Sequence, residues 1–239
     1  DKIYDQALSD GRCYKWLEHL SLKIGHRISG SPAAEKAVNW TRSVLDTMGF
    51  DSVWLQPCMV PHWVRGAKEK CSLRSVKLKL TLNLNCIALG SSVGTKSGGI
   101  KTKVIEVKSF EELEKLGEPA IRGNIVFYNV FFDQTKIRTG NAYGEAVKFR
   151  GRGASMAAKY GAVASLVRSM TSVADDEPHT GNMNYDSTLS VRKIPAVALS
   201  YKAADDLHNT LAKDPQMEVY LETHCQMLAP EKSFNVVGQ

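Results

Sequence analysis

The stretch GRGASMAAKYGAVASLVRSM, from Gly151 to Met170, decides the fold class. Its first half repeats small residues such as Ala154 and Ala158 at helical spacing, and Gly161 suits a left-handed turn that ends the helix. Its second half, Ala162 to Val167, is an apolar run without polar alternation. Such a run is typical of a strand covered on both faces, although a buried helix segment can show the same pattern. A helix that leads into a buried strand predicts an α/β fold.

Further strands and helices are predicted on both sides of this stretch. Before it, residues 124–130 (NIVFYNV) predict a buried strand, and residues 133–150 predict a polar loop. After it, residues 171–190 predict a long loop, of the kind that often carries function. Residues 194–199 and 217–223 predict two more strands, with a helix between them that Ser200 caps. A last strand is expected at residues 234–237, and the chain stops inside it, which suggests a cut chain.

The N-terminal part predicts helices followed by one strand. Residues 3–22 predict two helical pieces that are separated at Gly11 and share a packing face. Ser31 and Pro32 suit the N-cap and first position of a helix that runs to about Gly49. Residues 50–60 then predict a strand.

From Pro61 the composition changes towards a more antiparallel module. Residues 100–107 predict a strand, and Ser109 with Glu112 forms a capping-box signature for a helix that Gly117 ends. The alternation at residues 76–80 predicts a strand whose solvent face carries Lys77 and Lys79.

Composition restricts the classes of partner. The 239 residues are 43% hydrophobic with a formal net charge of +6, but no apolar run approaches the roughly 18 residues of a membrane span. The basic residues of segment 65–79 lack interleaved aromatic side chains that could stack bases, so nucleic acid is not an expected partner. The five cysteines are widely spaced with no C-x-x-C pair, which argues against a structural zinc site and leaves one or two disulfides open: Cys13, Cys58, Cys71, Cys86 and Cys225.

No complete catalytic constellation is present in the sequence. Gly90 to Gly94 matches the G-x-S-x-G pattern of a nucleophile elbow, but no helix follows, so Ser92 is interpreted as part of a turn. Gly151 and Gly153 lack the third glycine and the preceding strand of a dinucleotide fingerprint. The six histidines are scattered, without H-E-x-x-H or His and Asp pairs at short spacing. We therefore predict no catalytic residue and no metal ligand in this chain.

One loop tetrapeptide stands out: Pro178, His179, Thr180 and Gly181. A histidine in a short loop between proline and glycine, soon after a buried strand, can reach a neighbouring surface. These four residues are the candidates for lining a ligand cleft, and a purely structural turn is the competing interpretation.

Several motifs in collinear order resemble one family. They are GHRISGSPAAEKAV, VWLQPCMVPHWVRG, ALGSSVGT, GNIVFYN, AAKYGAVASLVRS, PHTG, KIPAVALS and SFNVVGQ, which together cover nearly the whole chain. This order resembles the zinc exopeptidases related to plasma glutamate carboxypeptidase (carboxypeptidase Q). One departure is His26, where members of the family usually have proline.

The resemblance implies a fold and a division into domains. Residues 1–64 would be the opening elements of a mixed-sheet α/β catalytic domain, and residues 65–229 an inserted protease-associated α+β domain. Residues 230–239 would be the strand that returns to the catalytic domain. The family's metal ligands and general base follow this strand, so none of them is expected within residues 1–239.

The resemblance also implies a function for the complete protein. Two zinc ions would support hydrolysis of dipeptides or short peptides in a secreted or periplasmic enzyme, and homodimer formation is left open. This chain alone would hold no zinc and would be inactive. The alternative is a non-catalytic protease-associated module that binds peptides or protein partners.

Overall fold

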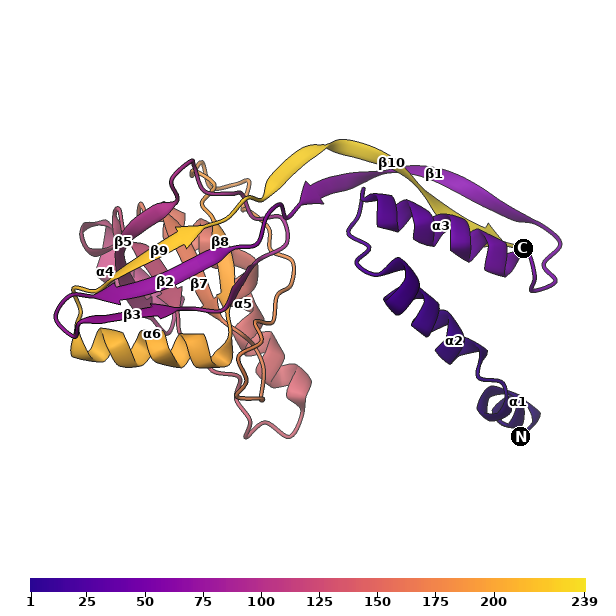
Figure 1. Ribbon diagram of the computed structural model, residues 1–239, viewed down its shortest axis with the longest axis horizontal. Helices are drawn as coiled ribbons and strands as arrows, with labels where there is room; N and C mark the ends of the chain where they lie inside the picture. The colour runs from indigo at the N-terminus through magenta and orange to yellow at the C-terminus, as the bar shows by residue number, and fades with distance from the viewer. The chain divides into compact units, whose positions relative to one another are not determined.

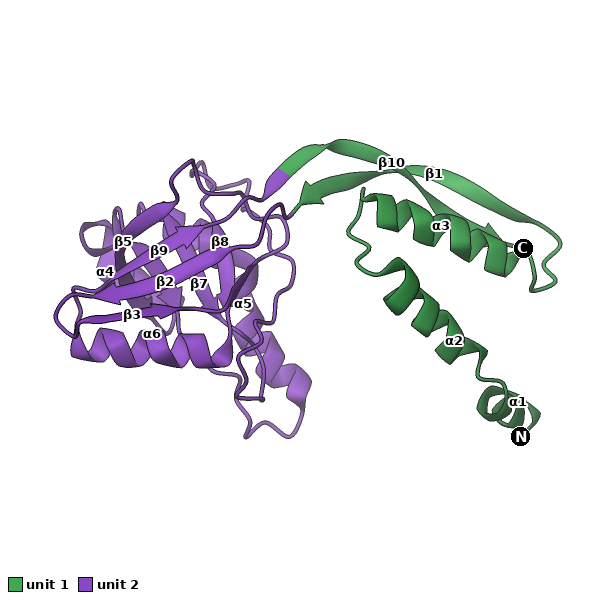
Figure 2. Ribbon diagram, in the orientation of Figure 1, with its two compact units in different colours: residues 1–64, 227–239 green, residues 65–226 purple.

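A computed structural model describes residues 1–239, which form two compact units (Figures 1 and 2). Unit 1 contains Asp1–Val64 and Met227–Gln239, and unit 2 contains Arg65–Gln226. The assignment of the inserted segment as a protease-associated domain stays a prediction.

Unit 2 is built on a curled mixed sheet with the strand order β3-β2-β9-β5-β6-β7-β8-β4. Strands β5 to β8 pair in parallel, and the pairs formed by β2, β3, β4 and β9 are antiparallel. The predicted α/β class is confirmed. The strands are β2 (Lys70–Ser75), β3 (Leu80–Asn83), β4 (Cys86–Ala88), β5 (Ile100–Val107), β6 (Ile125–Tyr128), β7 (Ala164–Arg168), β8 (Ala196–Leu199) and β9 (Glu218–Glu222).

The core of unit 2 lies around three strands that are buried along their whole length, β6, β7 and β8. Helices α4 (Phe110–Ile121), α5 (Thr139–Lys159) and α6 (Tyr201–Lys213) complete the unit. The rings of Phe110, Tyr128 and Phe149 pack together with centroids 4.8 to 5.8 Å apart. The central strands lack polar alternation because both of their faces are covered.

The stretch from Gly151 to Met170 forms the predicted helix and strand. Helix α5 ends at Lys159, Gly161 has a positive φ of 82°, and the buried strand β7 follows. The prediction of a loop up to Arg150 is wrong, because α5 already begins at Thr139. Its early turns bury side chains at helical spacing against the core, and this packing outweighs the low helix propensity of Gly140 and Gly144.

Two further local predictions need correction. Residues 76–79 form a turn between β2 and β3 rather than a strand, with Lys79 at a φ of 51° and Val76 78% exposed. The alternation there reflects a hairpin tip, which period-two patterning cannot distinguish from a half-buried strand. Gly117 interrupts the helical backbone as expected, but α4 resumes beyond it to Ile121.

Unit 1 consists of helices and a two-stranded sheet, β1 with β10. The predicted N-cap is confirmed, since the Ser31 hydroxyl accepts a hydrogen bond from the Ala34 amide at 3.2 Å. No helix of the structure is both long and apolar enough to cross a bilayer. The elements are α1 (Lys2–Ser9), α2 (Arg12–Glu18), the π-helix η1 (His19–Ile24), α3 (Pro32–Leu45), β1 (Val53–Val64) and β10 (Gln226–Gly238).

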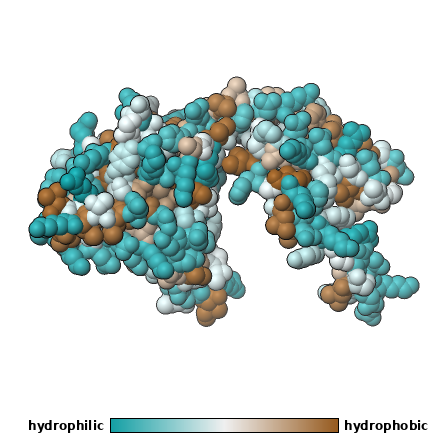
Figure 3. Space-filling view, viewed as in Figure 1, coloured by the Kyte–Doolittle hydropathy of each residue, from teal (hydrophilic) through white to brown (hydrophobic).

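Unit 1 buries very little of its apolar surface. No residue of α1, α2, η1 or α3 is buried, and Ile3 and Leu8 are 85% and 83% exposed. Figure 3 shows apolar side chains among the hydrophilic ones over these helices. The apolar side chains of residues 3–22 that were predicted to form a packing face are therefore exposed in the structure. Unit 1 lacks the core that a stable domain of its size requires.

Candidate functional site

The carboxyl ends of the parallel strands of unit 2 gather polar residues from distant parts of the chain. Asn129 directly follows β6, Arg168 ends β7 and Ser200 directly follows β8. Ligands of open α/β sheets bind at this edge. The edge is therefore the place in unit 2 to look for a functional site.

Arg168 is the centre of this edge, and its side chain has no exposed surface. Its Nε donates to Asn129 Oδ1 at 2.6 Å and its Nη2 donates to Asp205 Oδ1 at 2.7 Å. The guanidinium contacts two aromatic rings that also touch each other, 4.1 Å from the centroid of Phe131 and 4.8 Å from that of Tyr201. Arginine suits such a position because its planar group can stack and donate several hydrogen bonds at once. Arg168 thus holds Asn129 and Asp205 in place, and its nitrogen atoms already donate to protein acceptors.

The polar contacts continue from Arg168 to the surface. Asn129 Nδ2 donates to Glu106 Oε1 at 2.8 Å, and the Glu106 carboxylate lies 2.8 Å from His208 Nδ1. The His208 side chain is 42% exposed, whereas that of Glu106 is 17% exposed. A carboxylate that holds one ring nitrogen of histidine leaves the other nitrogen free to meet a proton or a ligand. His208 and Asp205, whose side chains are 42% and 41% exposed, are the members of this network that a ligand can reach.

The loop with Pro178, His179, Thr180 and Gly181 lies beside β4, the last strand of the sheet. The His179 amide donates to Ser169 Oγ at 2.7 Å, and the Thr180 hydroxyl donates to the Ala88 carbonyl at 2.9 Å. The Gly90 amide donates to the Gly181 carbonyl at 2.9 Å. The tetrapeptide thereby covers an edge that would otherwise be open. The His179 ring is 49% exposed and lies 4.0 Å from Asp175, so it remains accessible.

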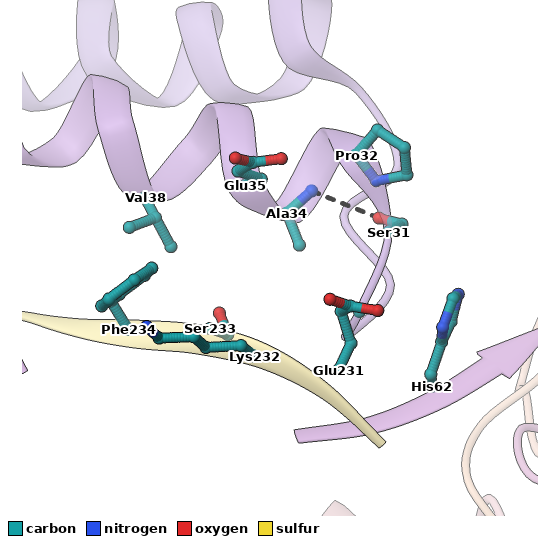
Figure 4. A pocket seen from close by; sticks show the side chains of 11 residues that line it. Ser31, Pro32, Ala34, Glu35, Val38, His62, Glu231, Lys232, Ser233 and Phe234 are labelled. Atoms are coloured by element: carbon teal, nitrogen blue, oxygen red, sulfur yellow. Dashed lines mark hydrogen bonds between the residues drawn. The ribbon is translucent and has the colours of Figure 1, made fainter. Parts of the chain in front are cut away.

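Unit 1 has a pocket of about 330 Å³ between the start of α3, the end of β1 and the middle of β10. Figure 4 shows Glu35, His62 and Glu231 around it, from three different elements. Gly30, with a φ of 78°, has no room for a side chain because a Cβ there would lie 2.9 Å from His62 Cγ. The three titratable side chains do not converge closely enough to form a metal site.

The other motifs have structural roles. Ser92 is buried, and its hydroxyl donates to the Val93 carbonyl and accepts from the Ala196 amide at 2.9 Å. Gly151 and Gly153 lie inside α5 rather than in a turn after a strand. No group of three or more histidine, cysteine or acidic side chains that could hold a metal ion occurs anywhere in the chain.

Several proteins are similar to the chain over nearly its whole length, among them a carboxypeptidase and a bacterial peptidase. Carboxypeptidase Q of Bos taurus is 33% identical over 237 residues, which are 99% of this chain and 47% of the relative. The solved structure of a peptidase M28 precursor from Shewanella amazonensis SB2B is 30% identical with a TM-score of 0.90, covering 99% of this chain and 52% of that one. The chain is a relative of the carboxypeptidase Q zinc exopeptidases.

The chain spans about half the length of the curated carboxypeptidase Q proteins that it matches. A zinc aminopeptidase from Bacillus subtilis shares the fold, with 20% identity, a TM-score of 0.57 and coverage of 94% of this chain and 45% of that one. No protein-family profile matches the chain. That neighbour is a zinc aminopeptidase, and these 239 residues contain no group of three or more side chains that could hold a metal ion.

The sequence singled out the loop at His179, whose role as a cleft lining stays a prediction, and it did not indicate the network of Glu106, Asn129, Arg168, Asp205 and His208. The sequence did contain one indication of this network, because Asn129 and Arg168 are polar residues that each stand at the end of an apolar, buried run. What the sequence did not show is that these runs are neighbouring parallel strands.

Proposed function

We propose that this chain is part of a secreted metallo-exopeptidase that hydrolyses dipeptides or short peptides with two zinc ions. The observation that carries the proposal is the 33% identity to a carboxypeptidase Q over 99% of the chain. Unit 2 would act in the complete protein as a protease-associated domain that restricts the substrates to short peptides, and the residues Pro178, His179, Thr180 and Gly181 would line its ligand cleft.

The residues present do not fit a pair of zinc ions. Catalytic zinc needs about three protein ligands of the histidine, cysteine or carboxylate type, and no such group exists within residues 1–239. We therefore place the metal ligands and the general base beyond Gln239, where the family resemblance puts them, and assign no step of the reaction to this chain.

The metal content tests this placement directly. We expect the chain of 239 residues, dialysed against buffer with micromolar zinc, to retain no stoichiometric zinc in elemental analysis and to leave dipeptides intact. A longer chain that includes the natural continuation of the sequence should bind zinc and hydrolyse them. Tightly bound zinc in the shorter chain would contradict the placement of the ligands.

The alternative function is a non-catalytic module that binds peptides or partners. One observation favours it for unit 2, which has a core of its own around β6, β7 and β8, whereas unit 1 has none. A longer chain that binds a short peptide without ever hydrolysing it, zinc present, would establish this alternative.

The difference in burial gives a prediction for the separate units. We expect residues 65–226 alone to unfold in one cooperative transition, because the central strands and their covering helices are contained within them. Residues 1–64 alone should show no cooperative transition, since they contain a single strand, β1, without its partner β10, and none of their helices has a buried residue. Chemical denaturation followed by circular dichroism measures both. Cooperative unfolding of residues 1–64 would show that unit 1 needs no further chain.

A further inference from the structure

The curled sheet of unit 2 brings together two strands that are far apart in its strand order. Strand β2 is the second strand from one end of the sheet, and β4 is the last strand at the other end. The chain nevertheless passes from β3 to β4 through only Leu84 and Asn85, and the Leu84 amide donates to the Cys71 carbonyl at 2.9 Å. The sheet therefore forms a seam where β4 meets the start of β2.

Polar side chains fix the geometry of this seam. The Ala88 amide of β4 donates to Glu69 Oε1 at 2.8 Å, and the Ala88 carbonyl accepts from Arg65 Nη1 at 2.7 Å. Arg65 and Glu69 also form an ion pair at 3.1 Å, in which the Glu69 side chain is 4% exposed. Buried ion pairs with further hydrogen bonds hold a single arrangement, because any other one leaves a charge unpaired. Residues on the two sides of the seam are thus held in register.

Two cysteines face each other across this seam. Cys71 on β2 is buried, and Cys86, the first residue of β4, is half-buried. The two thiols are close enough to interact, and this interaction together with burial raises the pKa of the Cys71 thiol well above its ordinary value. Cys86 lies two residues beyond Leu84, which stands opposite Cys71, so both cysteines share one face of the strands. Both are free thiols in this structure.

We propose that Cys71 and Cys86 are a disulfide-forming pair that closes the seam of unit 2 under oxidising conditions. This inference does not depend on the proposed peptidase function. Of the other cysteines, Cys13 and Cys58 belong to unit 1, and the charged groups that act on the Cys225 thiol are Glu69 and Arg65 rather than another cysteine. Burial, reinforced by the charge of Glu69, raises the pKa of the Cys225 thiol to about 11.

The oxidation can proceed by exchange with a disulfide oxidant such as glutathione disulfide. The thiolate of Cys86, the more exposed of the two, attacks one sulfur of the oxidant, forms a mixed disulfide and releases one glutathione thiolate. Cys71 then loses its proton to solvent and attacks Cys86 Sγ, which releases the second glutathione. Two protein thiols are oxidised to one disulfide, and one glutathione disulfide is reduced to two thiols.

Peptide mapping of the whole chain tests the pairing. The chain is equilibrated in glutathione redox buffers, its remaining thiols are alkylated at low pH, and it is digested with trypsin without reductant. Cys71 lies in tryptic peptide 71–74 and Cys86 in peptide 80–96, whereas Cys225 lies in peptide 214–232. We expect a linked species of 71–74 with 80–96 that disappears on reduction. Alkylated peptide 71–74 in the oxidising buffer, or its linkage to 214–232, would overturn the proposal.

The thermal unfolding of the oxidised and reduced chains gives a second readout. A cross-link over the short loop through β3 should raise the unfolding midpoint of unit 2 by roughly 5–10 °C. The Cys86→Ser variant should lose this difference between buffers, and the matched Cys58→Ser variant in unit 1 should keep it. If both variants respond to oxidation alike, the stabilisation does not arise at the seam. Mapping of the unmodified chain decides the pairing even where a variant folds poorly.

Discussion

Replacing Arg168 with methionine is expected to lower the free energy of unfolding of unit 2 by about 3 kcal/mol, the largest effect that we predict for a polar residue. The change removes hydrogen bonds to Asn129 and Asp205 together with the cation–π contacts to Phe131 and Tyr201. Asn129 would keep its bond to Glu106, but its buried Oδ1 would lose the donor that Arg168 supplies. The loss stays moderate because Asp205 is 41% exposed and can be hydrated. Denaturant unfolding monitored by circular dichroism measures the change.

A surface arginine provides the matched control. Arg152 is 65% exposed and lies 3.8 Å from Asp186, and exposed ion pairs contribute little. Arg152→Met should therefore change the free energy of unfolding by less than about 0.5 kcal/mol. Arg168→Lys keeps the charge but not the planar fork, so its loss should lie between the two. Equal losses for Arg168→Met and Arg152→Met would show that the network does not stabilise the fold.

Gly153→Val should destabilise unit 2 by about 3 kcal/mol, in a helix where valine would otherwise be tolerated. A Cβ at Gly153 would lie 2.7 Å from Tyr128 Cε2, and the Tyr128 hydroxyl donates to the Gly153 carbonyl at 2.8 Å. Tyr128 cannot yield because its ring is buried and packs against Phe110 and Phe149. The midpoint and slope of chemical denaturation measure the loss.

The same helix contains the control for this prediction. A Cβ at Gly151 would meet no atom within 4 Å. Gly151→Ala should therefore stabilise the helix by up to about 1 kcal/mol, since alanine has the higher helix propensity. The two glycines are only two positions apart, yet substitution should stabilise the protein at Gly151 and destabilise it at Gly153. A stabilising alanine or valine at Gly153 would mean that α5 packs less closely on β6 than described.

Helix starts were the most predictable part of the fold. Ser31, Ser109 and Ser200 each accept a hydrogen bond from the amide three residues later, as their positions in the sequence indicated. These contacts are local, so a short window of sequence contains both partners. The start of α5 has no such cap and depends on burial of Ala142, Ala146 and Phe149, which only the tertiary structure supplies.

The candidate site was less predictable than the fold. The network joins Glu106, Asn129, Arg168 and His208, which more than a hundred positions of sequence separate at their extremes. The parallel pairing of β5, β6 and β7 brings these residues to one edge of the sheet. The hydrophobic pattern of a single strand does not reveal which strands become its neighbours. The seam cysteines were recognised only as candidates for one or two bridges for the same reason.

The two-stranded sheet of unit 1 has a consequence for the behaviour of the chain in solution. Strands β1 and β10 pair only with each other, so each presents an outer row of amide and carbonyl groups without a strand partner. Such rows accept additional strands from any chain of suitable sequence, including a second copy. Pro57, Pro61 and Pro230 lack amide donors and shorten the segments on which this can happen. Self-association through strand addition is therefore the hazard to control when the 239 residues are handled at high concentration.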